Sequence, residues 1–246
     1  MIIGVHGHAG SWFSSTEVGS VELNLALMDR YSLDRHVVSA SEAVAYDMVS
    51  GNSRPAEVLE TQPRLLGYVV VNPHDLAATA REPEKYRLAD RYVKVHTTYP
   101  SRPLTSPAIR DARAPAAEAG LPALVHTGDE TALGLVDVPE RHPDLRAIAG
   151  HLGGPAWRTA VEAARRSDRF CLEPCCSITD RGRFRHALDR DPLEQMLFGT
   201  GSTPVDPAVA MGVVPESDLT DDEYDHVMGR NAARLLGLEG EEDPTA

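Results

Sequence analysis

The first ten residues, MIIGVHGHAG (1–10), form a short apolar run that ends in two histidines one residue apart. Similar apolar runs recur along the chain, and each of them ends in polar residues. They are RHVVSAS (35–41), LLGYVVVNP (65–73), YVKVHTTY (92–99), PALVHTG (122–128), LRAIAGH (145–151), RFCLEPC (169–175) and QMLFGTG (195–201). Short runs of this composition predict strands, and stretches with helical patterning lie between them, such as SPAIRDARAPAAEAG (106–120).

The strand runs end near residues 8, 40, 72, 98, 127, 151, 175 and 200, so they follow one another every 24 to 32 residues. Even βα units with no reversal predict an α/β protein with a (β/α)8 TIM barrel as a single domain over residues 1–238. The last helix is expected within 220–238, and 239–246 reads as an acidic disordered tail. A doubly wound sheet would need a glycine-rich phosphate loop after the first strand, and HGHAGSW (6–12) does not match that pattern.

The composition excludes several classes of partner. The 246 residues carry a formal net charge of −13, which argues against binding to nucleic acid or to an anionic membrane surface. No apolar run is long enough for a membrane span, and three cysteines do not suggest a disulfide framework. We therefore expect a cytoplasmic protein with a small-molecule substrate, and the sequence is compatible with a homo-oligomer.

Four histidines stand at the ends of three predicted strands. His6 and His8 share one face of the first strand, and His126 and His151 end the fifth and the sixth. Active sites of such barrels lie at the carboxyl ends of the strands, where neutral imidazoles can bind one divalent cation. The remaining histidines apart from His96 are expected to be ordinary surface residues: His36, His74, His142, His186 and His226.

Several of these motifs resemble those of the amidohydrolase-related family, in the branch that includes aminocarboxymuconate-semialdehyde decarboxylase. They are GVHGHAG (4–10), VKVHTTY (93–99), LVHTGD (124–129), IAGHLGGPAW (148–157), MLFGTGSTP (196–204) and NAARLLGL (231–238). The resemblance implies a metal-dependent barrel with His6, His8 and His126 as ligands of a divalent ion, for which zinc is favoured. His151 matches a residue that binds a second metal in binuclear relatives and serves catalysis or substrate binding in mononuclear ones.

Two positions depart from the family pattern. Gly4 stands near the place of an acidic residue that precedes the first histidine pair. Gly201 replaces the aspartate of the strand-8 GTD motif, which in the family binds metal and serves as the general base. Two carboxylates are candidate substitutes. Glu173 shares a strand face with Cys171 and Cys175 and either lines the site or forms a structural ion pair, whereas Asp206 either reaches the site or caps the helix that follows it.

Lys94 and His96 share one face of the fourth strand, opposite two valines. A lysine that points into the barrel can hold an acidic substrate or pair with Glu173. The resemblance implies a third role, because in some binuclear relatives a lysine on this strand is carboxylated and bridges two metals. His96, Tyr99 and Trp12 are expected to shape the substrate pocket. The sequence therefore favours a metal-dependent hydrolase of a small amide, ester or lactone. A metal-dependent decarboxylase of a small unsaturated or aromatic acid and a degenerate, non-catalytic ligand-binding barrel are the alternatives.

Overall fold

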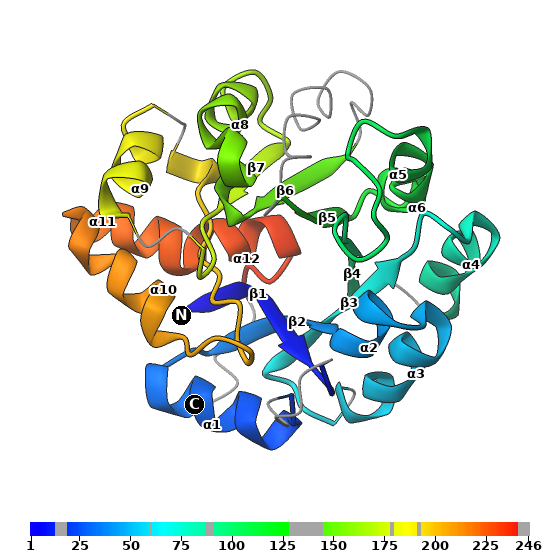
Figure 1. Ribbon diagram of the computed structural model, residues 1–246. Helices are drawn as coiled ribbons and strands as arrows, with labels where there is room; N and C mark the ends of the chain where they lie inside the picture. Colours follow the sequence, from blue (N-terminus) through cyan, green and yellow to red (C-terminus); the bar gives the residue numbers. More distant parts are fainter. Residues whose placement is uncertain are drawn as a thin grey trace.

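The computed structural model describes residues 1–12, 19–59, 61–86, 91–127, 145–177, 180–190 and 193–240. Its seven strands form one parallel sheet in the order β1-β2-β3-β4-β5-β6-β7. The strands are β1 (Ile3–Ala9), β2 (Arg35–Ala40), β3 (Leu65–Val71), β4 (Arg91–Val95), β5 (Pro122–His126), β6 (Arg146–Gly150) and β7 (Phe170–Glu173). The sheet curls so that the strands lie around the centre of the molecule with helices outside them (Figure 1). The predicted succession of parallel α/β units is thereby confirmed.

The helices connect consecutive strands or follow the last one. They are α1 (Val21–Tyr31), α2 (Ser41–Ala45), α3 (Met48–Leu59), α4 (Leu76–Lys85), α5 (Pro107–Ala112), α6 (Ala114–Glu118), α8 (Trp157–Ala164), α9 (Arg181–Leu188), α10 (Ala208–Val213), α11 (Asp221–Asp225) and α12 (Asn231–Leu236). Local signals define their ends: the Ser20 hydroxyl accepts the Leu23 N–H at the start of α1, and Thr220 with Glu223 forms a capping box on α11. A π-helical turn, His226–Arg230, joins α11 to α12 within the predicted final helix.

The segment 196–202 lies between β7 and β1 and hydrogen-bonds to both. Leu197 N–H donates to Leu172 O, and Val5 N–H donates to Phe198 O, each at 2.9 Å. Isolated parallel bridges join Leu172 to Met196 and Gly7 to Ser202. The two outer strands of the sheet are therefore connected through the segment that the sequence predicts as the eighth strand.

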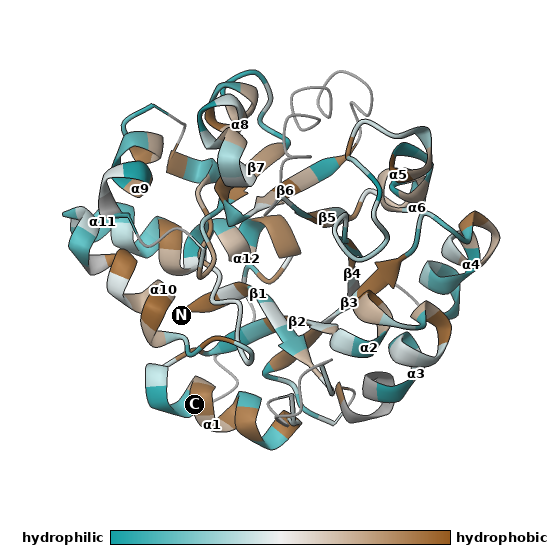
Figure 2. Cartoon of the chain, viewed as in Figure 1, coloured by the Kyte–Doolittle hydropathy of each residue, from teal (hydrophilic) through white to brown (hydrophobic). Residues whose placement is uncertain are grey.

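Two large buried apolar clusters lie on either side of the strands, and a third, small one joins Ala40, Ala43, Val44 and Val70. The inner cluster takes residues from every strand and from the 196–202 segment: Ile3, Val5, Val37, Tyr68, Tyr92, Leu124, Ile148, Cys171 and Leu197. Helix α12 adds Ala232, Ala233 and Leu236, and the Tyr92 hydroxyl donates to Leu236 O, so α12 covers the beginnings of the strands. The outer cluster joins the strands to the surrounding helices, and Figure 2 shows apolar and polar stretches alternating along both strands and helices.

Side-chain alternation on β4 and β7 places charged residues inside the ring of strands. Val93 and Val95 belong to the outer cluster, and Lys94 between them is fully buried on the opposite face. Phe170 and Leu172 likewise face the helices, which leaves Glu173 directed inward. Residues 241–246 of the predicted acidic tail lie outside the described residues. Within the described part of the chain, no helix has the length and apolar character needed to cross a bilayer.

Candidate functional site

A cavity of about 210 Å³ opens where the strands end. The residues that line it include His8, Trp12, His96, Tyr99, His126, His151, Cys175, Cys176 and Gly201. They come from the ends of β1, β4, β5, β6 and β7 and from the loops beyond. The structure therefore brings together most of the site residues that the sequence predicts, because the carboxyl ends of parallel strands meet at one end of the sheet.

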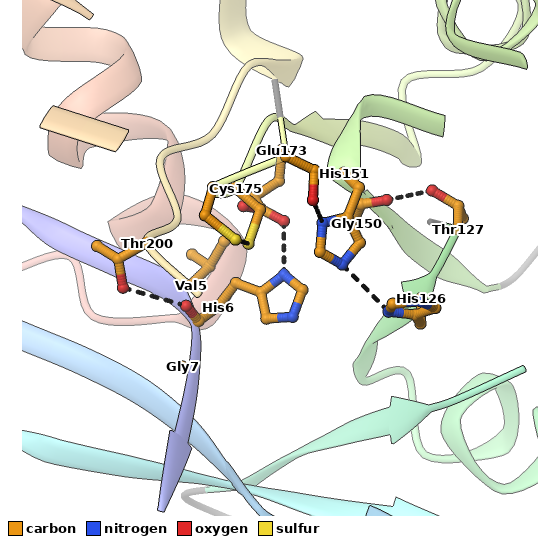
Figure 3. A network of polar contacts seen from close by, with 12 residues as sticks. Val5, His6, Gly7, His126, Thr127, Gly150, His151, Glu173, Cys175 and Thr200 are labelled. Atoms are coloured by element: carbon orange, nitrogen blue, oxygen red, sulfur yellow. Dashed lines mark hydrogen bonds and ion pairs between the residues drawn. The ribbon is translucent and has the colours of Figure 1, made fainter. Parts of the chain in front are cut away.

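His6 lies beneath this cavity between two buried charged groups. Its Nδ1 donates to Glu173 Oε2 at 2.8 Å, and Lys94 Nζ donates to its Nε2 at 3.0 Å. All three side chains are at most 1% exposed. A carboxylate that holds one ring nitrogen of a histidine fixes the tautomer and presents the other nitrogen, an arrangement common behind metal-bound histidines. Figure 3 shows His6 and Glu173 joined in this way.

His151 and His126 form a second pair beside His6. His151 Nε2 lies 3.1 Å from His126 Nδ1, and Ser177 Oγ lies 2.9 Å from His151 Nδ1. The His6 and His151 ring centroids are 5.0 Å apart, and those of His126 and His151 are 4.6 Å apart. The three rings therefore converge on one volume (Figure 3). The Ser177 hydroxyl contacts the outer side of His151.

Aromatic rings form one wall of the cavity. His96 stacks on His126 with centroids 3.9 Å apart, and Tyr99 packs against His96 at 4.8 Å. Trp12 meets Tyr99 edge to face at 5.5 Å and His8 at 5.1 Å. The predicted pocket residues Trp12, His96 and Tyr99 are thus continuous with the predicted ligands His8 and His126.

Burial keeps these imidazoles neutral. It lowers the pKa of His6, His8 and His96 well below the usual value, with the positive charge of Lys94 acting in the same direction. Burial also lowers the pKa of His126 to about 2 and that of His151 to about 3. Neutral imidazoles keep a free lone pair, which is the form that binds a metal ion.

The donors fit a divalent ion on three observations. Ligand atoms of His6, His151 and Cys175 all lie within 4.8 Å of one another. Two nitrogens bound to one tetrahedral zinc at 2.0–2.1 Å would be about 3.3 Å apart, close to the 3.1 Å between His126 and His151. Glu173 Oε1 is buried and makes no hydrogen bond within the described residues, which favours a nearby cation.

Among the described residues, Lys94 is the group of the site that opposes a cation, because its amine lies against His6 Nε2. Burial lowers the pKa of Lys94, and it raises the pKa of Glu173 despite the opposing effect of the lysine. Lys94 and Glu173 therefore interact through His6 rather than as the direct ion pair that the sequence suggests as one reading. Burial lowers the pKa of Lys94 only to about 8, so the amine keeps much of its positive charge at neutral pH, and a metal ion at His6 Nε2 would have to displace it.

Two cysteine sulfurs occupy the space above Gly201. Gly201 has φ +68°, and a Cβ there would lie 2.8 Å from Cys175 Sγ and 2.7 Å from Cys176 Sγ. Hydrogen bonds with Cys175 and Ser177 lower the pKa of Cys176 to about 7. Cys175 and His151 both adopt left-handed backbone angles, with φ of 52° and 63°. Such angles are uncommon outside glycine and often mark functional positions.

Two residues lie elsewhere than the sequence suggests. Asp206 is exposed and accepts hydrogen bonds from the Tyr31 hydroxyl and the Ala208 N–H, so its helix-end role is the one the structure supports. The expectation that His36 is a surface residue is wrong. It is 1% exposed, and its Nε2 contacts Thr200 Oγ1 at 3.2 Å because Gly7 leaves room for its ring. His142 lies outside the described residues.

Sequence reasoning missed the second layer of the site. His36, Ser39, Ser177 and Thr200 contact predicted site residues or one another there, and Cys175 and Cys176 contact each other at the cavity wall. The adjacent cysteines at 175 and 176 directly after the buried glutamate strand were the available signal. Their significance depends on Gly201, which is distant in the sequence and adjacent in space.

Comparisons with known proteins agree with this geometry. Two solved structures are decarboxylases: 5-carboxyvanillate decarboxylase from Sphingomonas paucimobilis has a TM-score of 0.74 and 16% identity over 96% of this chain and 98% of its own. The same enzyme from Novosphingobium aromaticivorans, complexed with manganese and 4-hydroxy-3-methoxy-5-nitrobenzoic acid, has a TM-score of 0.74 and 12% identity, and the match covers 96% of each chain. A probable 2-pyrone-4,6-dicarboxylic acid hydrolase from Acinetobacter baumannii, with citric acid bound, has a TM-score of 0.74 and 12% identity. The match covers 96% of this chain and 99% of the hydrolase.

These structural similarities, at identities of 16% or below, show a shared fold. A search of curated protein sequences finds no match. The family model described as Amidohydrolase matches residues 7–238, which include three of the four strand-end histidines, His8, His126 and His151, and extend through α12. The chain therefore belongs to the amidohydrolase family.

Proposed function

We propose that this protein is a metal-dependent enzyme that hydrolyses a small, uncharged amide, ester or lactone. The observation that carries the proposal is the convergence of four neutral imidazoles: those of His8, His126 and His151 line one cavity, and that of His6 lies directly beneath it. Membership of a family of metal-dependent enzymes supports the same reading. We further propose zinc as the ion, because imidazole nitrogen is among its preferred ligands.

The nitrogen donors for this ion come from among the four histidines, and one position of a tetrahedral site stays open for water. When bound, a divalent ion at such a site lowers the pKa of water toward about 7 and polarises a carbonyl group. Glu173 holds the proton of His6 on Nδ1, which puts the lone pair on Nε2, where Lys94 donates to it at 3.0 Å until an ion takes its place. Ser177 orients the His151 ring from its outer side, and the Ser39 hydroxyl contacts His8 Nδ1 at 3.2 Å. These contacts preorganise the rings before a ligand binds.

The cavity favours an uncharged substrate. Its lining, within the described residues, contains neither lysine nor arginine, so a free carboxylate would meet only neutral side chains there. Lys94 is fully buried beneath His6 and does not line the cavity. A volume of about 210 Å³ suits a small molecule, and the rings of Trp12 and Tyr99 offer it an apolar wall.

Decarboxylation of a small unsaturated or aromatic acid is the second candidate. Aromatic rings offer a planar acid a flat surface in this cavity: His96 stacks on His126, and Trp12 packs against His8 beside them. Among the proteins of similar fold, 5-carboxyvanillate decarboxylase acts on an aromatic acid. A non-catalytic ligand-binding role follows only if Gly201 has removed the chemistry, and the metal content of the protein tests that reading first.

We also propose that the chain closes into an eight-unit barrel and that residues 1–238 are one domain. The hydrogen bonds of the 196–202 segment to β7 and β1 support closure. The inner cluster supports it as well, because Leu197 packs with Ile3 and Cys171 from the two neighbouring strands.

The test begins with elemental analysis of the purified protein, followed by a panel of neutral amides, esters and lactones and of unsaturated and aromatic acids. We expect about one divalent ion per chain, with hydrolysis that stops on chelation and returns with zinc. The variant His6→Ala/His8→Ala should lose both the ion and the activity. Stoichiometric metal in that variant would contradict the assigned ligands, and CO₂ release without hydrolysis would favour the decarboxylase.

A further inference from the structure

The place of the strand-8 carboxylate is filled by sulfur in this protein. The Cβ direction of Gly201 points at the two thiols, 2.8 Å from Cys175 Sγ and 2.7 Å from Cys176 Sγ. The two sulfurs are 3.7 Å apart. A side chain at position 201 and a thiol in this space exclude each other, so the two cysteines can occupy it only because residue 201 is glycine.

Cys175 is the cysteine that also reaches the histidines. Its Sγ and one ring nitrogen each of His6 and His151 lie within 4.8 Å of one another, and all three residues are buried. The left-handed backbone at Cys175, with φ of 52°, turns the chain sharply just beyond β7. Cys171 instead lies deep in the inner apolar cluster, and Cys176 is half-buried at the cavity wall.

We propose that the Cys175 thiolate is a ligand of the bound metal ion and takes the place of the missing strand-8 carboxylate. This inference rests on the proposed metal-dependent function. Binding forms a sulfur–metal bond, and the thiol proton leaves to the solvent, with no change of oxidation state. Three protein ligands with a fourth position left open are the rule in catalytic zinc sites, and such sets can combine histidine with cysteine.

The thiolate changes which ions the site selects. Sulfur ligands favour zinc and cobalt, whereas carboxylate and other oxygen ligands suit manganese and magnesium. The protein should therefore retain zinc or cobalt in competition with a large excess of manganese. The single replacement of an oxygen donor by Cys175 accounts for this preference without any change in the histidines.

Cobalt substitution of the reduced full-length protein tests the proposal. Thiolate bound to cobalt(II) produces an intense near-ultraviolet charge-transfer band, which imidazole and carboxylate ligands do not produce. We expect this band in the wild type at one cobalt per chain, and its loss in Cys175→Ser. The matched controls Cys171→Ser and Cys176→Ser should both keep it. X-ray absorption of the zinc-loaded wild type should show one sulfur at about 2.3 Å, a measurement that needs no variant.

The outcomes of this experiment show whether the role of Cys175, the proposed metal dependence, or both have failed. Stoichiometric cobalt with visible d–d bands but no thiolate band would overturn the role of Cys175 and leave the metal-dependent function intact. A band that disappears in Cys176→Ser and persists in Cys175→Ser would overturn it in favour of the neighbouring thiol. A wild type that binds neither cobalt nor zinc would overturn both proposals together. Circular dichroism of each variant establishes that loss of the band does not reflect unfolding.

Discussion

Adding a single methyl group at Gly201 should destabilise the protein through two separable effects. The first is the backbone, because a φ of +68° costs a residue with a Cβ about 1–2 kcal/mol. The second is the contact of the new Cβ with Cys175 Sγ and Cys176 Sγ at 2.8 and 2.7 Å. Overpacking of this kind costs about 1–3 kcal/mol. Gly201→Ala should therefore lose about 2–5 kcal/mol, or about 4–20 °C in Tm for a chain of this size.

Gly120 provides a matched control for the backbone effect. It has a φ of +65°, and a Cβ there meets nothing within 4 Å. Gly120→Ala should therefore lose only about 1–2 kcal/mol. Urea unfolding of the metal-free proteins measures both changes under the same conditions, so that metal binding does not contribute. The difference between the two variants gives the free energy of the contact with the thiols.

A third background tests the cause directly. In a Cys175→Ala/Cys176→Ala protein, the two sulfurs are absent, and Gly201→Ala should cost no more than Gly120→Ala does. Equal costs for Gly201→Ala and Gly120→Ala in the wild-type background would refute the reasoning. Gly201→Asp would carry at least the same penalty, so restoring the family's aspartate alone should not repair the site.

Three other changes test the site and its support. His151→Asn should lower both metal content and turnover, because His151 belongs to the closest group of ligand atoms; full metal content with a turnover loss of about 10²–10⁴ would instead assign it to proton transfer. Lys94→Met should raise metal affinity in calorimetry by removing the amine 3.0 Å from His6 Nε2, whereas loss of metal would indicate a carboxylated lysine ligand. Arg185 lowers the pKa of Glu223 from 4.5 to about 2. Stability from this pair is therefore present above pH 4.5 and lost as the pH falls toward 2. In urea unfolding, Glu223→Gln should reduce the fall in the free energy of unfolding between pH 4.5 and pH 2. An unchanged fall would exclude this ion pair as its cause.

The sequence by itself determined the order of the elements and the end of the sheet where the chemistry lies. Strand periodicity is a local property, so the alternation around Lys94 and Glu173 correctly placed both side chains inside the sheet. The paired histidines His6 and His8 marked the carboxyl end of the first strand in the same way. These inferences needed only neighbouring residues, because one residue's direction fixes that of the next in a strand.

Tertiary structure alone decided which groups meet at that end. Glu173 reaches His6 across 167 residues of sequence, and Cys175 fills the space above Gly201 only because the 196–202 segment lies between β7 and β1. His36 is buried because Gly7 leaves space for its ring, and Asp206 turns away to Tyr31. Such contacts depend on sheet curvature and on left-handed loop residues. Neither leaves a periodic signal, since a loop side chain's direction follows from its own backbone angles and from partners distant in the chain.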